Sequence, residues 1–396
     1  MRWYPECGPV AAVPRLDHDA AMTWTDTPVL LLTGPPRHGV ARYAADVAGH
    51  VRALDAGARA VRVDDPADLP AAVAGLGAAH LHVTDRLLAG SPESAADLVE
   101  RVAAACRLTV TLHDVPQESD GARNLPRRTT AYARVAAAAH GVVVNSRHEE
   151  RLLVEHGVAP AGRVHVVPLG SAPGPVAAAE VPAGAPPAGA PLVALVAGFL
   201  YPGKGHDDVV RAAAAAADLL RAAGTPPGEV AVVAVGGPSP GHEDEVDRLR
   251  AEAEGMGVAL RVTGGLDDDA FRAALRGPGV PVAAHRHLSA SRTLLDWGEA
   301  GRRPLVVDSR YAREMADLRP GTLALYPAAD LPGHLARAWA DPASTALPPG
   351  AGLAPTLVDV AAAYLAWWGA GAGCAAGPAG GDGGRTAGPA DDGAAA

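Results

Sequence analysis

The segment LVALVAGFLYPGKGHDD, residues 192–208, carries Lys204 between two glycines. Its apolar first half predicts a buried strand that ends at Gly198, and the alanine-rich run 209–220 predicts a helix that begins shortly after the lysine. A lysine in a glycine loop before a helix is suited to binding a phosphate, because free backbone N–H groups and the helix dipole both favour an anion there. We therefore predict a phosphate-binding turn at Lys204.

Two polar pairs follow other apolar runs of strand character. His113 and Asp114 follow LTVTL, and Asn145 and Ser146 follow GVVV, where Ser146 is expected to cap the next helix. Parallel strands place such residues at the carboxyl edge of the sheet, where open α/β sheets bind ligands. His113 and Asp114 are therefore candidates for a ligand site.

The loop GPPRHG at residues 34–39 has the glycine spacing of a P-loop, but Val40 and Ala41 stand where a P-loop has lysine and serine or threonine. ATP hydrolysis by this motif is excluded. Two interpretations stay open, namely a tight turn between strand and helix, or a glycine loop whose N–H groups lie under a bound ligand.

Acidic clusters at 64–65 and 267–269 are expected to begin helices rather than to bind a metal, because acidic side chains favour the first turn of a helix. We expect neither a metal nor another cofactor.

Strand and helix patterns alternate along the chain, which predicts parallel sheets with helices on both faces. The 396 residues exceed one typical domain of roughly 100–200 residues, and a stretch rich in proline, alanine and glycine separates two similar halves. We predict an α/β protein with two Rossmann-like domains that face a central cleft. The predicted parts are a disordered leader 1–26, a first domain 27–172, a linker 173–190, a second domain 191–350, a final amphipathic helix 351–370 and a disordered tail 371–396.

Composition excludes several classes of function. The net charge is −10 and no dense run of basic residues is present, which argues against nucleic-acid binding. Cys7, Cys106 and Cys374 lie far apart, so a disulfide framework or a zinc site is not expected and a reducing cytoplasm fits best. We expect no signal peptide and no membrane-spanning helix. Peripheral membrane contact and the oligomeric state stay open.

The order of the motifs resembles that of a known family. LTVTLHD, VVVNSRHEERLLVEHGV and RVHVVPLG are followed by GFLYPGKGHDDVVRA and later by a serine-rich loop, a helix and PLVVDS. This series, between Val29 and Trp368, is similar to the GT-B glycosyltransferases of the retaining type, the group 1 or family 4 enzymes that include bacterial mannosyl- and glucosyltransferases. The resemblance implies that the final helix crosses back to pack on the first domain.

The resemblance also implies roles for individual residues. In the family, the donor nucleotide sugar binds mainly the second domain and the acceptor mainly the first. Lys204 matches the lysine that contacts the donor diphosphate, and His113 matches a histidine near the transferred sugar. Gly39 matches a glycine turn near the donor phosphates, and the loop from Gly264 to Leu266 matches the loop that holds the nucleobase. The implied partners are a UDP-, GDP- or ADP-linked sugar and an unidentified acceptor, without a metal.

One departure from the family pattern concerns the second cation. The family has an arginine five residues before its lysine, as a second phosphate contact, and this chain has Phe199 there. Arg211 and Arg292 are candidates to replace it.

Another departure concerns the family's two glutamates, which lie eight residues apart. Leu288 replaces the first and Asp296 the second. In the loop between them, the hydroxyls of Ser289 and Ser291 are candidates to hold a sugar hydroxyl or a phosphate, although Ser289 alternatively only caps the next helix. Glu314 follows the next strand and is expected to line the same cleft.

Three functions follow from this pattern. The first is a retaining glycosyltransferase. The second, motivated by Phe199 and Leu288, is a catalytically silent GT-B protein that binds a nucleotide sugar or glycan or serves as a partner subunit. The third is a nucleotide-sugar epimerase, a chemistry that occurs on the same fold. A dehydrogenase is the weakest alternative, because no GxGxxG follows a predicted strand.

Overall fold

The computed structural model describes residues 27–172, 174, 181–182, 184–285 and 287–371. The predicted leader, part of the predicted linker and nearly all of the predicted tail lie outside these residues. Within the described residues, no helix is both long and apolar enough to cross a membrane.

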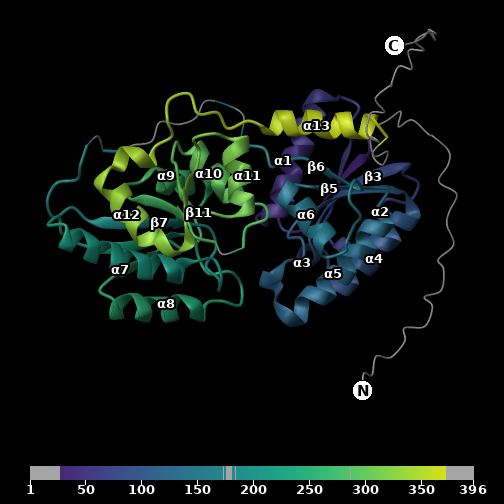
Figure 1. Ribbon diagram of the computed structural model, residues 1–396. Helices are drawn as coiled ribbons and strands as arrows, with labels where there is room; N and C mark the ends of the chain where they lie inside the picture. The colour runs from purple at the N-terminus through teal and green to yellow at the C-terminus, as the bar shows by residue number, and fades with distance from the viewer. Residues whose placement is uncertain (1–26, 173, 175–180, 183, 286, 372–396) are drawn as a thin grey trace, which may run out of the picture.

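The first domain is a six-stranded parallel sheet in the order β2-β1-β3-β4-β5-β6, covered by helices (Figure 1). Its strands are β1 (Val29–Thr33), β2 (Ala60–Val63), β3 (Ala78–Val83), β4 (Arg107–Leu112), β5 (Gly141–Val144) and β6 (Val164–Val166). Its helices are α1 (Gly39–Leu54), α2 (Leu69–Ala72), α3 (Asp85–Leu88), α4 (Pro92–Ala105), α5 (Gly121–Ala138) and α6 (Arg147–Glu155), with short 3₁₀ turns η1 (Pro66–Asp68) and η2 (Glu118–Asp120).

The second domain repeats this plan with the strand order β12-β11-β10-β7-β8-β9, again parallel throughout. Its strands are β7 (Leu192–Ala197), β8 (Val230–Val235), β9 (Ala259–Val262), β10 (Val280–Ala283), β11 (Leu305–Val307) and β12 (Ala324–Tyr326). Its helices are α7 (His206–Ala222), α8 (Asp244–Gly255), α9 (Asp268–Arg276), α10 (Arg292–Glu299), α11 (Arg310–Leu318) and α12 (Leu331–Ala340), with 3₁₀ turns η3 (Ala328–Asp330) and η4 (Pro342–Thr345).

Each sheet has its own apolar core, built mainly of alanine, valine and leucine. Several strands are short uninterrupted apolar runs because both faces of a parallel sheet are buried. Central strands such as VAVVAV in β8 and LVALVA in β7 show this pattern. The alternation of strand and helix in the sequence therefore predicted this architecture correctly.

The final helix, α13 (Leu357–Gly369), leaves the second domain and lies along α1 of the first, as Figure 1 shows. Tyr364 and Trp368 are buried there, and the Tyr364 hydroxyl is 2.7 Å from the hydroxyl of Thr111 on β4. The apolar face of this helix packs on the first domain, and the expected crossover is confirmed.

Two segments connect the domains, and the structure ties them together. Residues 169–172 leave the first domain after β6, and residues 353–357 lead back to α13. Ser171 forms a parallel bridge with Thr356, and its N–H donates to the carbonyl of Pro355 at 3.1 Å. The domains are thus joined by a two-stranded connection.

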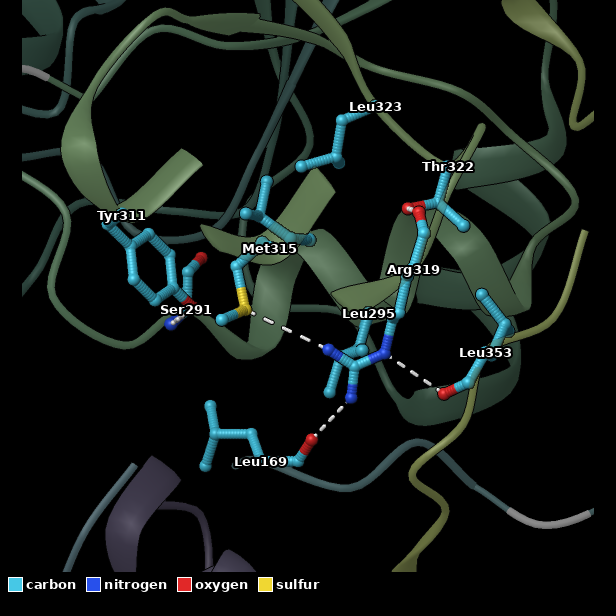
Figure 2. A pocket seen from close by; sticks show the side chains of 10 residues that line it. Leu169, Ser291, Leu295, Tyr311, Met315, Arg319, Thr322, Leu323 and Leu353 are labelled. Atoms are coloured by element: carbon cyan, nitrogen blue, oxygen red, sulfur yellow. Dashed lines mark hydrogen bonds between the residues drawn. The ribbon is translucent and has the colours of Figure 1, made fainter. Parts of the chain in front are cut away.

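Arg319, which follows α11, is held at this connection (Figure 2). It is only 4% exposed. Its Nε donates to the carbonyl of Leu353 at 3.0 Å, and its Nη2 donates to that of Leu169 at 2.7 Å. The adjoining cavity has a volume of about 20 Å³, room for about one water, so it is too small for an organic ligand. One guanidinium therefore binds the segment that leaves the first domain and the segment that returns to it.

The stretch 115–128 contains η2 and the first two turns of α5. Helix α5 begins at Gly121 and includes Pro126 in its interior. Arg128 on this helix is buried and pairs with Asp85 at 3.0 Å and with Asp120 at 2.7 Å. These contacts support the early turns despite the proline.

Candidate functional site

Lys204 lies in the loop between β7 and α7, at the carboxyl edge of the second sheet, and is only 6% exposed. Gly198, at φ +104°, brings the backbone so close that a Cβ there would lie 3.0 Å from the Lys204 Nζ and 3.7 Å from the Thr293 hydroxyl. Gly205, at φ +90°, packs directly against the carbonyl of Ala284. Glycine is required at both positions by the positive φ and the close approach, and the packed loop fixes the ammonium group.

The ammonium group of Lys204 has little compensation from the protein. Burial lowers its pKa to about 8, an effect that the carboxylate of Asp296 opposes. Across the described ranges no hydrogen bond or ion pair to its Nζ is present. Burial also raises the pKa of Asp296 to about 6, against the opposing effect of Arg292, whose Nε lies 3.0 Å from the Asp296 Oδ1. A buried cation without a direct partner is suited to an anionic ligand.

Lys204 is the only lysine in the whole sequence, although 34 residues are lysine or arginine. Sequence reasoning on the motif alone missed this signal. All the remaining basic residues of this count are arginines, and only position 204 has the more compact ammonium group. The close approach of the Gly198 backbone to the buried Nζ supplies a physical reason, because a planar guanidinium is larger than an ammonium group.

Of the two arginines considered as replacements for the missing cation, only Arg292 lies at this site. Arg211 is paired with acidic side chains of α7 and α8 on the surface. Arg292 pairs with Glu299 at 2.6 Å as well as with Asp296, and donates to the carbonyl of Gly170 in the interdomain connection at 3.2 Å. Phe199 is 57% exposed, so an aromatic ring in solvent occupies the position of the family's arginine.

The serine loop before α10 is buried between the domains. The hydroxyl of Ser146, at the start of α6, donates to the carbonyl of Ser289 at 2.8 Å, and the N–H of Ser291 donates to the Tyr311 hydroxyl at 2.9 Å. Helix α10 begins at Arg292, so Ser291 and not Ser289 occupies the capping position, and its hydroxyl makes no capping bond. The interpretation of Ser289 as a helix cap is therefore wrong.

Glu314, which was expected to line the cleft, forms hydrogen bonds with the backbone of the first domain. Its two carboxylate oxygens accept hydrogen bonds from the backbone N–H groups of Arg147 at 2.7 Å and His148 at 2.9 Å. These N–H groups have no partner within helix α6 because they lie at its N-terminus, where the helix dipole also stabilises a carboxylate. The structure therefore gives Glu314 a contact between domains.

His113 follows β4 and is buried against two aromatic side chains. Its Nε2 is 3.0 Å from the Nδ1 of His82, the two rings stack with centroids 5.2 Å apart, and the Tyr43 ring meets it edge-on at 6.0 Å. Burial above all, and then the neighbouring histidines, hold the pKa of His113 well below its usual value. The imidazole is therefore neutral at pH 7.

The loop that carries Lys204 lies opposite the end of β4. Tyr201 in this loop has its pKa raised by burial and by the nearby carboxylate of Asp114, the residue after His113. Asp114 has φ 47°, and among the described residues it is the one non-glycine residue in the left-handed region. Strained backbone of this kind occurs often at functional sites. The structure thus brings the edges that carry His113 and Lys204 to one interface, which we call the interdomain site.

The remaining residues that were predicted to bind the donor nucleotide sugar lie on two loops at the same interface. Gly39 is the first residue of α1, and a Cβ placed on it would contact nothing within 4 Å. Gly264, at φ +72°, lies in the loop after β9, and Leu266 in that loop packs partly buried against the apolar cluster that includes Trp297. The helices after the two loops are joined by a bidentate ion pair between Arg42 and Asp268, with N···O distances of 2.8 and 2.7 Å.

The run 267–269 begins a helix, as expected. The Asp267 side chain accepts a hydrogen bond from the N–H of Ala270 at 2.8 Å and caps α9. Among the side chains that the structure describes, no three His, Cys, Asp or Glu residues are grouped so that they could hold a metal ion.

Glu149 gives a prediction on stability. It is buried at the domain interface, one of its oxygens accepts from the N–H of Asn145 at 2.8 Å, and burial raises its pKa to about 8. Between pH 4.5 and 8 the folded state keeps a proton that the unfolded state has released, so stability falls as pH rises through this window. We expect the stability of Glu149→Gln relative to the wild type to increase by up to about 4 kcal/mol from pH 5 to 8 and then to level off.

Urea unfolding at several pH values measures this effect. Glu254→Gln, at an exposed position on α8, is the control and should follow the wild-type pH dependence. Parallel stability curves for Glu149→Gln and the wild type would show that the carboxyl group is ionised in the folded protein.

Comparison with known proteins agrees with this architecture. No protein-family model matches the chain. A D-inositol 3-phosphate glycosyltransferase from Acidothermus cellulolyticus is 40% identical over 141 residues, which make up 34% of this chain and 30% of that protein. The matched part of this chain therefore spans less than a third of the relative's length.

Two solved structures resemble the whole fold. Anabaena HepE in complex with UDP and glucose has a TM-score of 0.59 and 15% sequence identity, over 85% of this chain and 95% of that one. Sucrose-phosphate synthase from Thermosynechococcus elongatus has a TM-score of 0.58 and 15% identity, over 86% and 96% of the two chains. With two parallel six-stranded sheets, the chain has the GT-B fold, and the predicted fold class is confirmed.

Proposed function

We propose, from the GT-B fold and the interdomain site, that the protein is a retaining glycosyltransferase which moves a sugar from a nucleoside diphosphate to an acceptor. The observation that carries this proposal is the buried, poorly compensated ammonium group of Lys204 at the start of α7. Anabaena HepE, which shares the fold, is described with UDP-glucose. We accordingly place UDP-sugars first among the candidate donors.

Lys204 would act on the leaving group. When the bond between the anomeric carbon and the diphosphate oxygen breaks, its electron pair stays on the diphosphate, and negative charge builds up where the ammonium group stabilises it. The acceptor hydroxyl forms the new bond on the face that the diphosphate leaves, and its proton passes to the departing phosphate oxygen. We propose that Lys204 and the loop N–H groups perform this task without a metal.

The other predicted residues are assigned to the same ligands. We propose that the loop from Gly264 to Leu266 holds the nucleobase and that the Gly39 turn faces the donor phosphates. We propose that Ser289 and Ser291, together with Asp296 on the helix that follows, shape the sugar pocket. We propose a cytoplasmic enzyme, since three widely separated cysteines favour a reducing compartment.

A panel of donors tests the proposal. The protein is incubated with UDP-, GDP- and ADP-linked glucose and mannose, with and without D-inositol 3-phosphate as acceptor, and release of free nucleotide is followed. We expect release with at least one donor, accelerated by an acceptor. Saturable donor binding without release would instead indicate a non-catalytic GT-B protein, a reading that the packed Leu288 and the exposed Phe199 motivate.

Restoring the missing cation should strengthen donor binding. We expect Phe199→Arg to bind UDP about 5-fold more tightly, because an exposed arginine on the Lys204 loop adds about 1 kcal/mol of attraction to the diphosphate. Phe199→Gln is the uncharged control, and calorimetry at two salt concentrations is the measurement. The gain should shrink at high salt. Equal UDP affinities for the two variants would place the diphosphate away from this loop.

A further inference from the structure

His82 stacks against His113, and the proposed mechanism assigns it no role. It belongs to β3, is only 4% exposed, and its Nδ1 is 3.0 Å from the Nε2 of His113. The Tyr43 ring packs edge-on against both imidazoles, with centroid distances of 5.8 Å to His82 and 6.0 Å to His113. The pair is therefore held from several sides and cannot rotate freely.

The contact between the two rings contains one proton. Burial, more than any neighbouring charge, holds the pKa of both imidazoles well below the usual value, so each ring is neutral and has one N–H and one unprotonated nitrogen. The proton in the contact is therefore carried either by the Nδ1 of His82 or by the Nε2 of His113. The choice decides which nitrogen of His113 has the other proton.

The second nitrogen of His82 settles the choice. Its Nε2 is fully buried and has no hydrogen-bond partner among the described residues. A proton on this nitrogen would leave a buried N–H donor unpaired, and such donors are rarer in proteins than unpaired acceptors. With the proton on Nδ1, His82 donates to His113 and leaves only a lone pair without a partner. His80 on the same strand shows the contrast, since its two nitrogens lie 2.9 and 3.1 Å from the hydroxyls of Thr109 and Thr111.

We infer that His82 is a positioning residue that fixes His113 in the Nδ1–H tautomer, so that His113 presents a hydrogen-bond donor to the interdomain site. The Nδ1 of His113 is not among the fully buried nitrogens that lack a partner. It would donate to an oxygen of the bound ligand, such as a sugar hydroxyl, and it cannot act as a general base without first losing the bond to His82. The ligand assignment rests on the proposed function, whereas the tautomer does not.

The tautomer is read in the protein without substrate. Long-range ¹H–¹⁵N spectra of protein labelled with ¹⁵N-histidine distinguish protonated from unprotonated ring nitrogens, and His113→Asn assigns the signals. We expect a protonated Nδ1 and an unprotonated Nε2 at His113. The reverse pattern, or a doubly protonated ring at pH 7, would overturn the inference whether or not the protein transfers sugar.

Two variants of His82 test the consequence for turnover. His82→Asn keeps an N–H donor near the original Nδ1, whereas His82→Leu removes it. With the donor that the panel identifies, we expect His82→Leu to lower kcat/KM about 10-fold and to show a mixture of His113 tautomers. His82→Asn should retain the wild-type tautomer and most of the activity. Equal loss in the two variants with an unchanged His113 tautomer would reduce His82 to a packing residue and contradict the inference.

Discussion

Replacing Lys204 with methionine should weaken UDP binding about 100-fold and slow nucleotide release by about 100- to 1000-fold. Methionine keeps the length of the side chain, so the change removes the charge and its hydrogen bonds rather than the packing. Uridine, which has no phosphate, should bind the variant as well as it binds the wild type. Calorimetry with both ligands and steady-state release of nucleotide measure the effect.

Lys204→Arg separates charge from shape. It retains a cation, but the close approach of the Gly198 backbone to the buried Nζ leaves little room for a planar guanidinium. We expect arginine to recover less than a tenth of the lost affinity. If uridine binding fell as far as UDP binding in the methionine variant, the cause would be damage to the loop and not the loss of a phosphate contact.

Lys204→Met should be more stable than the wild type. Lys204 has a pKa of about 8 in the folded protein against about 10.5 when unfolded, so charging it in the folded state is unfavourable. The penalty is fully present below pH 8 and decreases as pH rises from 8 to 10.5, because the folded state then holds fewer protons than the unfolded state. Lys204→Met should therefore gain up to about 3 kcal/mol at pH 7. Lower activity with higher stability is the pattern expected of a functional residue.

Arg319→Met should cause the largest loss of stability, about 3 kcal/mol. The guanidinium donates to the carbonyls of Leu169 and Leu353, which belong to the two segments that connect the domains. Methionine fills much of the space but leaves both buried carbonyls with one partner fewer. We expect a lower urea midpoint and, in small-angle scattering, a wider distribution of distances between the domains.

Arg313→Met is the matched control, because Arg313 lies on α11, six residues before Arg319, but is exposed and, among the described residues, pairs with Asp308. Its unfolding free energy should change by less than about 0.5 kcal/mol. A similar small change in Arg319→Met, with unaltered scattering, would mean that the two connecting segments do not depend on this cation.

Local signals in the sequence predicted much of this protein. The apolar runs that became β7 and β8 needed no knowledge of their neighbours, and the glycine pattern around Lys204 reflects backbone positions that require positive φ. The cap on α6 was also predicted correctly, since the Ser146 side chain accepts a hydrogen bond from the Glu149 N–H.

The contacts between domains could not be predicted from sequence, because they join residues far apart in the chain. Its place after a strand predicted that Glu314 lines the cleft, yet its partners are N–H groups about 166 positions earlier in the chain. Arg319 carries no motif at all. His82 had a weak signal, since histidines alternate in the apolar run AHLHV, but its stacking with His113 required the register of β3 and β4.

The most direct test uses the fact that Lys204 is the only lysine. Reductive ¹³C-methylation labels its Nζ and the N-terminal amine, which peptide mass spectrometry separates. We expect labelling of Lys204 to be fast near its pKa of about 8 and to be blocked by a UDP-, GDP- or ADP-sugar, with half-protection at the dissociation constant found by calorimetry. Labelling of Lys204 that stays unchanged at millimolar concentrations of every nucleotide sugar, while the N-terminal amine reacts normally, would contradict the proposed donor site.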